Sequence, residues 1–224
     1  DTSNDVWVSG WTSSSNFPVT EGAFNETWNG GIDVFVACFN TSLSDLKAAT
    51  YIGGNGDEMA NDIKISPSGA VYIAGVTDSI DFPTTPTAYD TTNNNSKDVF
   101  ISKLNSDLTA LSASTYLGGN LGNDEAFELT FDPSENIYIT GGTTSSDFPT
   151  TPGAYDRTLN KGGTGEDAFV AKLNSGLESL QASTFLGGIG SDEGVAVLLD
   201  GVNNVYIVGS TQSNDFPGTS SAYD

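Results

Sequence analysis

Short apolar segments alternate along the whole chain with stretches rich in Gly, Pro, Asn and Ser. The segments are rich in Val, Ile, Tyr and Phe, which is typical of β-strands. None of them shows the apolar period of an α-helix. One stretch predicts four strands, at residues 62–66, 71–76, 99–104 and 111–117. The segment 71–74 is apolar on both faces, so we expect its sheet to be covered on both sides.

The same motifs recur in a fixed order along the chain. A Phe-Pro pair starts one long loop in each repeat, at Phe17, Phe82, Phe148 and Phe216, so the period is 65 to 68 residues. We name the four strands of a repeat A to D. Four-stranded antiparallel sheets that stack face to face are the blades of a β-propeller. We therefore predict an all-β fold, a β-propeller of four-stranded antiparallel blades.

The chain contains about three and a half such repeats. The predicted units are residues 1–57 (strands B, C and D), 58–123, 124–191 and 192–224 (strands A and B with a loop). Because these units do not make a ring of complete blades, we expect an incomplete ring or open arc with two apolar end faces. The expected partners are adjoining blades or further copies of the chain. No signal peptide opens the sequence, so we expect it to have been cleaved or to lie outside this stretch.

The motifs themselves resemble a known family. Residues 141–156 read GGTTSSDFPTTPGAYD, residues 167–174 read DAFVAKLN, and residues 183–188 read STFLGG. This pattern resembles the SBBP repeat, the seven-bladed β-propeller repeat of bacterial and archaeal surface proteins. The resemblance implies a propeller fold and an extracellular or cell-surface location, and it implies no catalytic activity. The first repeat departs from the pattern, with Asn16 in place of Asp and Cys38 in place of Lys.

The composition excludes several classes of protein. The 224 residues include 29 Asp and Glu, 7 Lys and Arg, one Cys and no His, for a net charge of -22. Without His there is no Ser-His-Asp triad and no His-ligated metal. Cys38 alone forms no intrachain disulfide and no thiolate metal site. The charge argues against nucleic acid as a partner, and no apolar stretch is long enough for membrane insertion.

Acids and insertions gather in the loops between strands B and C and between strand D and the next strand A. These loops leave an antiparallel blade on one face, which in repeat folds is often the binding face. Oxygen ligands on Gly-rich loops suit Ca²⁺, so adjacent acids in the D–A loops are candidate calcium ligands: Asp57, Glu58, Asp124, Glu125, Asp192 and Glu193. The alternative is that the acids cap turns and keep the surface soluble.

Two further groups of residues are candidate sites. Trp11 and Trp28 break the repeat, so they are candidates for binding a ligand such as a glycan. Asn25, Asn40 and Asn94 each begin an Asn-x-Ser/Thr sequence, which is the acceptor of N-glycosylation.

These observations predict a non-enzymatic, extracellular structural or adhesive module of a cell-surface or filament assembly, with Ca²⁺ as a candidate stabilising ion. The first alternative is a module that binds glycans or a protein. The second is a polysaccharide hydrolase or lyase that uses paired carboxylates. Against an enzyme, the acids recur in every repeat, whereas a catalytic pair should occur in one place.

Overall fold

The computed structural model describes residues 4–94, 96–160, 162 and 165–218. These residues contain strands but no helix, and the strands form four antiparallel sheets. In chain order the sheets are β1 (Val6–Thr12), β2 (Asp33–Phe39) and β3 (Leu46–Ile52); β4 (Glu58–Ile65), β5 (Val71–Thr77), β6 (Asp98–Leu104) and β7 (Leu111–Leu117); β8 (Asp124–Phe131), β9 (Ile137–Thr143), β10 (Asp167–Leu173) and β11 (Leu180–Leu186); and β12 (Asp192–Leu199) and β13 (Val205–Thr211).

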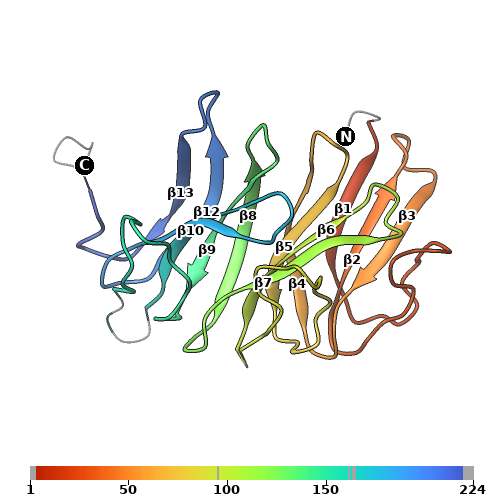
Figure 1. Ribbon diagram of the computed structural model, residues 1–224. Helices are drawn as coiled ribbons and strands as arrows, with labels where there is room; N and C mark the ends of the chain where they lie inside the picture. Colours follow the sequence, from red (N-terminus) through yellow and green to blue (C-terminus); the bar gives the residue numbers. More distant parts are fainter. Residues whose placement is uncertain (1–3, 95, 161, 163–164, 219–224) are drawn as a thin grey trace.

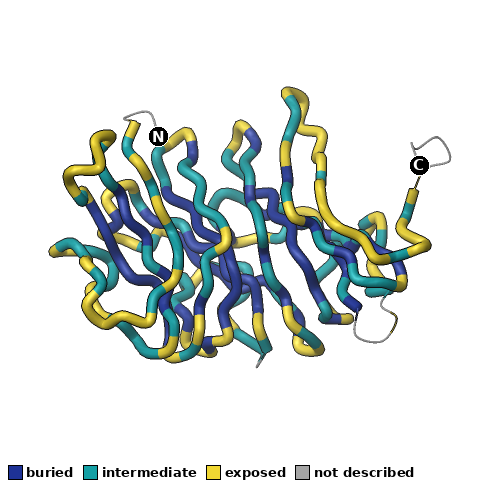
Figure 2. The backbone as a smooth tube through the Cα atoms, turned by 180° about the vertical axis from the view of Figure 1, so that it is seen from behind, coloured by how far each residue is buried: buried dark blue, intermediate teal, exposed yellow. Residues whose placement is uncertain are grey.

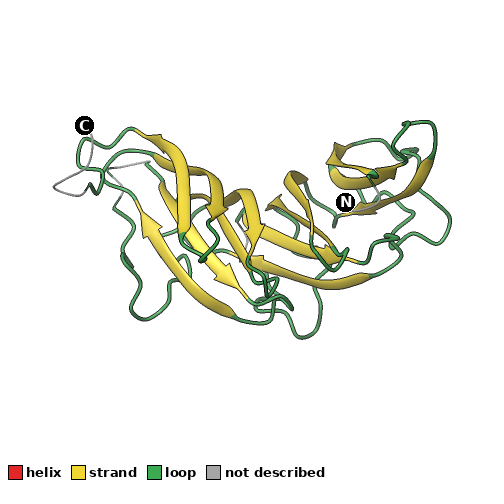
Figure 3. Cartoon of the chain, turned by 90° about the horizontal axis from the view of Figure 1, so that it is seen from above, coloured by secondary structure: helices red, strands yellow, loops and turns green. Residues whose placement is uncertain are grey.

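The sheets lie side by side in chain order, and the first and last sheets are at opposite ends of an open arc (Figures 1 and 3). Within each sheet every strand pairs with its neighbour in sequence. The B strands β5 and β9 are buried at every position, as their two apolar faces predicted. The prediction of an all-β propeller fold is confirmed, and among the described residues the blades do not close into a ring.

Strand A begins earlier than the sequence pattern predicted. The prediction started it at Asp62, but β4 starts at Glu58. A β-bulge explains the difference: Ala60 pairs with Gly75 and Asp62 pairs with Ala74, so Asn61 is an extra residue. An extra residue inverts the alternation of side chains, which hides the first half of the strand from a period-two pattern. The same irregularity occurs in β8 and β12.

Each bulge requires a glycine on the neighbouring strand B. A Cβ atom at Gly75, Gly141 or Gly209 would overlap the carbonyl oxygen of Met59, Glu125 or Glu193 respectively. Since that neighbour is backbone, no side-chain rotation would relieve the overlap. The recurring glycine in strand B is therefore a packing requirement of the fold.

The hydrophobic core lies between the blades. One cluster joins the first and second blades through residues such as Val36, Ile52 and Phe100, and a second joins the second and third blades through residues such as Ile101, Ile139 and Phe169. The Phe-Pro loops are anchored on the same core, because Phe82 and Phe148 are buried. Their rings lie 4.7 Å from Phe100 and 4.6 Å from Phe169.

The two ends of the arc expose apolar side chains. On β1, Val6, Val8 and Trp11 are exposed. At the other end β13 is exposed at every position except Ile207, which is half-buried, and Figure 2 shows this strand in the exposed colour beside buried strands. Burial of a sheet face in this molecule therefore depends on the blade next to it.

Candidate functional site

The most regular polar feature is a pair of buried acids at each junction between blades. One acid begins strand C of a blade and the other begins strand A of the next blade. The pairs are Asp33 with Glu58, Asp98 with Asp124, and Asp167 with Asp192, and all six side chains are buried. A Cβ atom on Gly53 would lie 2.5 Å from Asp33 Oδ1 and 2.6 Å from Glu58 Oε2. The two carboxyl groups thus face each other across a glycine that has no room for a side chain.

The acid of strand A joins two loops. Asp124 accepts hydrogen bonds from the Gly119 N–H at 2.8 Å and from the Ser145 hydroxyl at 2.9 Å, and it also accepts one from Thr143. In the next junction Asp192 accepts bonds from Gly188 at 2.7 Å and Ser213 at 2.6 Å. Each of these carboxylates therefore holds a D–A loop against the B–C loop of the following blade.

The acid of strand C has fewer partners. Its Oδ2 accepts one backbone N–H, from Asn29 to Asp33 at 2.8 Å and from Asn160 to Asp167 at 2.9 Å. The other oxygen of Asp33 and of Asp167 is buried with no hydrogen-bond partner among the described residues. A buried carboxyl group with an unpaired oxygen favours its protonated form.

The two negative charges of a junction pair repel each other. Burial, followed by the nearby Asp124 carboxylate among other contributions, raises the pKa of Asp98 to about 7. Burial raises the pKa of Asp124 and that of Asp167 to about 6. Asp98, Asp124 and Asp167 therefore hold their protons to a higher pH than ordinary carboxyl groups do. The sequence alone did not indicate this because the partners are distant in sequence.

A further set of acids anchors the rim of the same face. Asp81 accepts the Asn55 N–H at 2.9 Å, Asp147 accepts the Asn120 N–H at 3.0 Å, and Asp215 accepts the Ile189 N–H at 3.0 Å. In each case a B–C loop carboxylate binds the backbone of a D–A loop. These bonds join two loops that are distant in sequence, whereas the predicted alternative to calcium was a carboxylate that bonds the backbone of its own turn.

The predicted calcium ligands lie in these junctions but do not converge as pairs. Asp57 accepts the Ile32 N–H at 3.0 Å, whereas Glu58 is buried at the start of β4. Asp124 points into the junction, and Glu125 accepts a bond from Asn61 at 2.9 Å in the neighbouring blade. Within the described residues no group of three or more His, Cys, Asp or Glu is placed to hold a metal ion. Calcium binding stays a prediction for all six residues, Asp192 and Glu193 included.

One carboxyl pair does not recur between blades, and the sequence analysis missed it. Glu166 lies close to Glu193, and its pKa is raised by burial and then by the negative charge of Glu193. The positions equivalent to Glu166 hold Ile32 and Lys97. A departure from the repeat was the signal that could have identified this pair.

The other predicted site residues differ in accessibility. Trp11 is 55% exposed on β1, whereas the Trp28 indole nitrogen is buried with no hydrogen-bond partner in the part of the chain that is described. Trp11 is thus the better placed of the two for a ligand.

The candidate glycosylation sites lie on loops. Asn25 is half-buried and its side chain accepts the Thr27 N–H at 2.9 Å. Asn40 uses its side chain to cap the C–D turn, where it accepts the Ser44 N–H at 3.0 Å. Asn94 is half-buried, and the next residue of its acceptor sequence, Asn95, lies outside the described residues. Glycosylation stays a prediction at all three.

Comparison with known proteins identifies the repeat. No curated protein matches the chain. Among the described residues there is also no helix that could cross a membrane. Two segments, residues 114–149 and 183–217, match the family model SBBP, described as a beta-propeller repeat. Each matched segment runs from strand D of one blade through strands A and B of the next, so it contains one complete junction. These two segments therefore match the SBBP β-propeller repeat, which is the repeat that the sequence motifs resemble.

Proposed function

We propose that the chain is a non-enzymatic structural or adhesive module of an extracellular or cell-surface assembly. SBBP repeats are typical of secreted or surface proteins. The observation that carries the proposal is that the buried acids at the junctions hold neighbouring loops together. The same acids recur from blade to blade, and their oxygens accept hydrogen bonds from the loops that they join.

The arrangement of these acids supports a structural role over a catalytic one. A general acid or base has to reach a substrate proton, but Asp124 and Asp192 are fully buried and bonded to backbone N–H groups. The excess of acids on the surface also favours solubility outside the cell. Rigid blades with varied loops on one face suit a module that spaces or presents other surfaces.

The experiment that tests the proposal is antibody labelling of the cells that produce the chain. We expect intact cells to be labelled and the label to be lost after brief treatment with an external protease. Labelling that appears only after the cells are permeabilised would contradict the proposal.

A glycan- or protein-binding role is the first alternative, and the exposure of Trp11 favours it. An exposed aromatic ring on a sheet provides an apolar face for a sugar or a partner side chain. Binding on a glycan array that is lost in Trp11→Ala and kept in Ile80→Ala would support this role. Ile80 is a suitable control because it is also exposed and lies in a loop.

A polysaccharide hydrolase or lyase is the second alternative, favoured only by Glu166 and Glu193. Paired carboxyl groups with a raised pKa perform this chemistry in many glycosidases. Polysaccharide turnover that is lost in Glu166→Gln and kept in Glu178→Gln, an exposed acid on the C–D turn, would overturn the non-enzymatic proposal.

A further inference from the structure

The C–D turn of one blade inserts into the blade before it. Leu108 and Leu177 occupy equivalent positions in two such turns, with φ of 58° and 56°, and both side chains are fully buried. Their carbonyl oxygens accept backbone hydrogen bonds from the preceding blade, from Phe24 to Leu108 at 2.7 Å and from Tyr89 to Leu177 at 2.8 Å. Each turn is therefore held by an apolar side chain and by a backbone bond.

The second blade adds two side-chain donors to this arrangement. The Tyr72 hydroxyl donates to the Ser175 carbonyl at 3.1 Å, and the Lys103 ammonium donates to the same carbonyl at 3.3 Å. The Lys103 nitrogen also lies 5.1 Å from the centre of the Tyr72 ring. Tyr72, Lys103 and Tyr89 thus form a socket that binds two carbonyl groups of the turn around Leu177.

The third blade has the same three residue types at the equivalent positions, Tyr138, Lys172 and Tyr155. The Lys172 nitrogen lies 4.8 Å from the centre of the Tyr138 ring, as Lys103 lies near Tyr72, and it also pairs with Asp132 Oδ2 at 3.4 Å. The Tyr138 and Lys172 side chains both line an open pocket. Tyr155 is 72% exposed, whereas its counterparts Tyr89 and Phe24 pack against the core.

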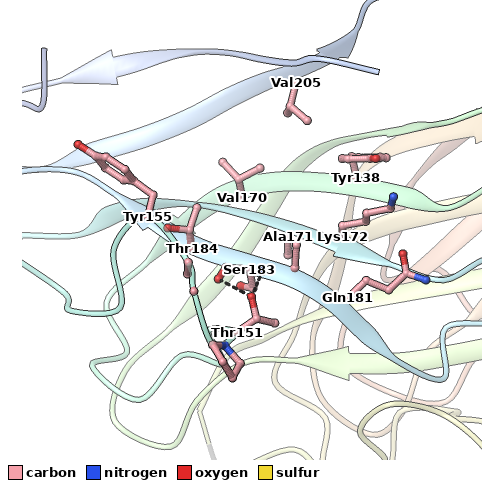
Figure 4. A pocket seen from close by; sticks show the side chains of 14 residues that line it. Tyr138, Thr151, Tyr155, Val170, Ala171, Lys172, Gln181, Ser183, Thr184 and Val205 are labelled. Atoms are coloured by element: carbon pink, nitrogen blue, oxygen red, sulfur yellow. Dashed lines mark hydrogen bonds between the residues drawn. The ribbon is translucent and has the colours of Figure 1, made fainter. Parts of the chain in front are cut away.

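The empty socket is a pocket of about 350 Å³. Figure 4 shows Tyr155 at one end of it and Tyr138 with Lys172 at the other, with Val205 of β13 above and Ser183 below. The pocket lies between the third blade and β13, which is the position that the C–D turn of the next blade takes in the filled socket.

The free edge of β13 points to the same occupant. In the complete blades strand B pairs with strand C, so that Tyr72 lies opposite Lys103 and Tyr138 lies opposite Lys172. In the sheet of β12 and β13, strand B has only strand A as a partner among the described residues. An unpaired edge beside exposed apolar side chains is a template for strand addition.

We propose that the socket of Tyr138, Lys172 and Tyr155 and the edge of β13 together bind a C–D hairpin of the same repeat type. The hairpin consists of two antiparallel strands joined by a turn with leucine in the left-handed conformation. Its strand C pairs with β13, its leucine enters the pocket, and its turn carbonyls accept bonds from Lys172, the Tyr138 hydroxyl and the Tyr155 N–H. The filled socket of the second blade is the model for each of these contacts, and the turn around Leu108 repeats the leucine burial and the backbone bond.

A second copy of the chain, with the same strand pairing, does not supply this hairpin. Its Leu43 turn is 63% exposed, with φ of 56°, and has the required conformation. However, β2 already pairs with β1 along the edge that β13 would need, from Val6 opposite Phe39 to Thr12 opposite Asp33. The occupant is therefore a hairpin whose strand C has a free edge.

The test is a binding titration with the full 224-residue chain. The probe is a fluorescein-labelled peptide of residues 167–186, which contains β10, β11 and the Leu177 turn. We expect saturable binding by fluorescence anisotropy and protection of the amides of residues 205–211 in hydrogen exchange. A peptide with Leu177→Asp should bind at least about tenfold more weakly, because leucine burial is lost. On the protein side, Lys172→Gln should weaken binding, whereas Lys47→Gln, in the first blade, should not.

Absence of binding, equal binding of the two peptides, or binding that leaves residues 205–211 unprotected would overturn the proposal. A covalent version avoids the need for the peptide to fold alone. Because Ala222-Tyr223-Asp224 repeats Ala154-Tyr155-Asp156, a copy of residues 157–191 placed after Asp224 continues the repeat in phase. The extended chain should unfold at a higher temperature than the same chain with the leucine of the copy changed to aspartate, and equal temperatures would also overturn the proposal.

This inference rests on the proposed structural role in one respect, because it assumes that the partner is another blade of the assembly. It is tested on purified protein, and the structural role is tested on cells. Failure of the hairpin to bind therefore leaves surface labelling unaffected, and failure of surface labelling leaves the binding result unaffected.

Discussion

Replacing Asp98 by asparagine should stabilise the protein at alkaline pH. Asp98 is buried opposite Asp124, and its pKa is raised from 3.8 to about 7. Since one pKa unit corresponds to about 1.4 kcal/mol, the charged form of Asp98 destabilises the folded chain by at most about 4 kcal/mol. The neutral amide keeps an oxygen that accepts the Asn94 N–H, which donates to Asp98 at 3.3 Å.

The direction of the pH dependence follows from the raised pKa. The folded state binds the Asp98 proton more tightly than the unfolded state, so the stabilisation is fully present below pH 3.8 and is lost as the pH rises through about 7. We therefore expect Asp98→Asn to raise the free energy of unfolding by about 2 kcal/mol at pH 8, because loop relaxation offsets part of the maximum. At pH 4 the variant and the wild type should have nearly equal stability.

Urea unfolding followed by tryptophan fluorescence at pH 4 and pH 8, with a chelator present, measures both values. Asp45→Asn is the matched control because it changes the net charge equally and lies exposed beside the first C–D turn. A loss of stability in Asp98→Asn at pH 8, or the same change at both pH values, would refute the assignment of a proton to this junction.

Three further predictions concern the bulge, calcium and the end face. Gly141→Ala should lower the free energy of unfolding by about 2 kcal/mol or more because its Cβ overlaps the Glu125 carbonyl, whereas Gly201→Ala, in open space, should have little effect in the same urea titration. If calcium binds the D–A loops, the melting temperature should rise with Ca²⁺, and the double substitution Asp124→Asn with Glu125→Gln should reduce the rise; an equal response to Na⁺ at matched ionic strength would leave only screening. The exposed face of β12 and β13 should cause self-association in sedimentation velocity, which Val208→Asp should reduce and Val202→Asp, in a turn, should not; a monomer at all concentrations would contradict this.

The sequence by itself determined the blade architecture. Strands such as Val71–Thr77 are strongly apolar, and the turns between them recur at constant spacing, so local pattern and repetition were sufficient to predict four-stranded sheets. The anchoring of the Phe-Pro loops was also predictable, because Phe82 and Phe148 stand at the same point of each repeat. Features like these depend on residues close together in the chain.

The tertiary structure alone decided which side chains meet across a junction. Asp98 and Asp124 are distant in sequence, and they come together only because strand C, strand D and the following loop fold back to one junction. The raised pKa of Asp98 therefore depends on the tertiary structure. The bulge at Asn61 is set by pairing with β5, so the alternation pattern concealed the start of β4. Leu177 and Leu43 occupy equivalent positions in two repeats, but Leu177 is buried and Leu43 is exposed. The difference arises because burial in this fold depends on whether a neighbouring blade is present.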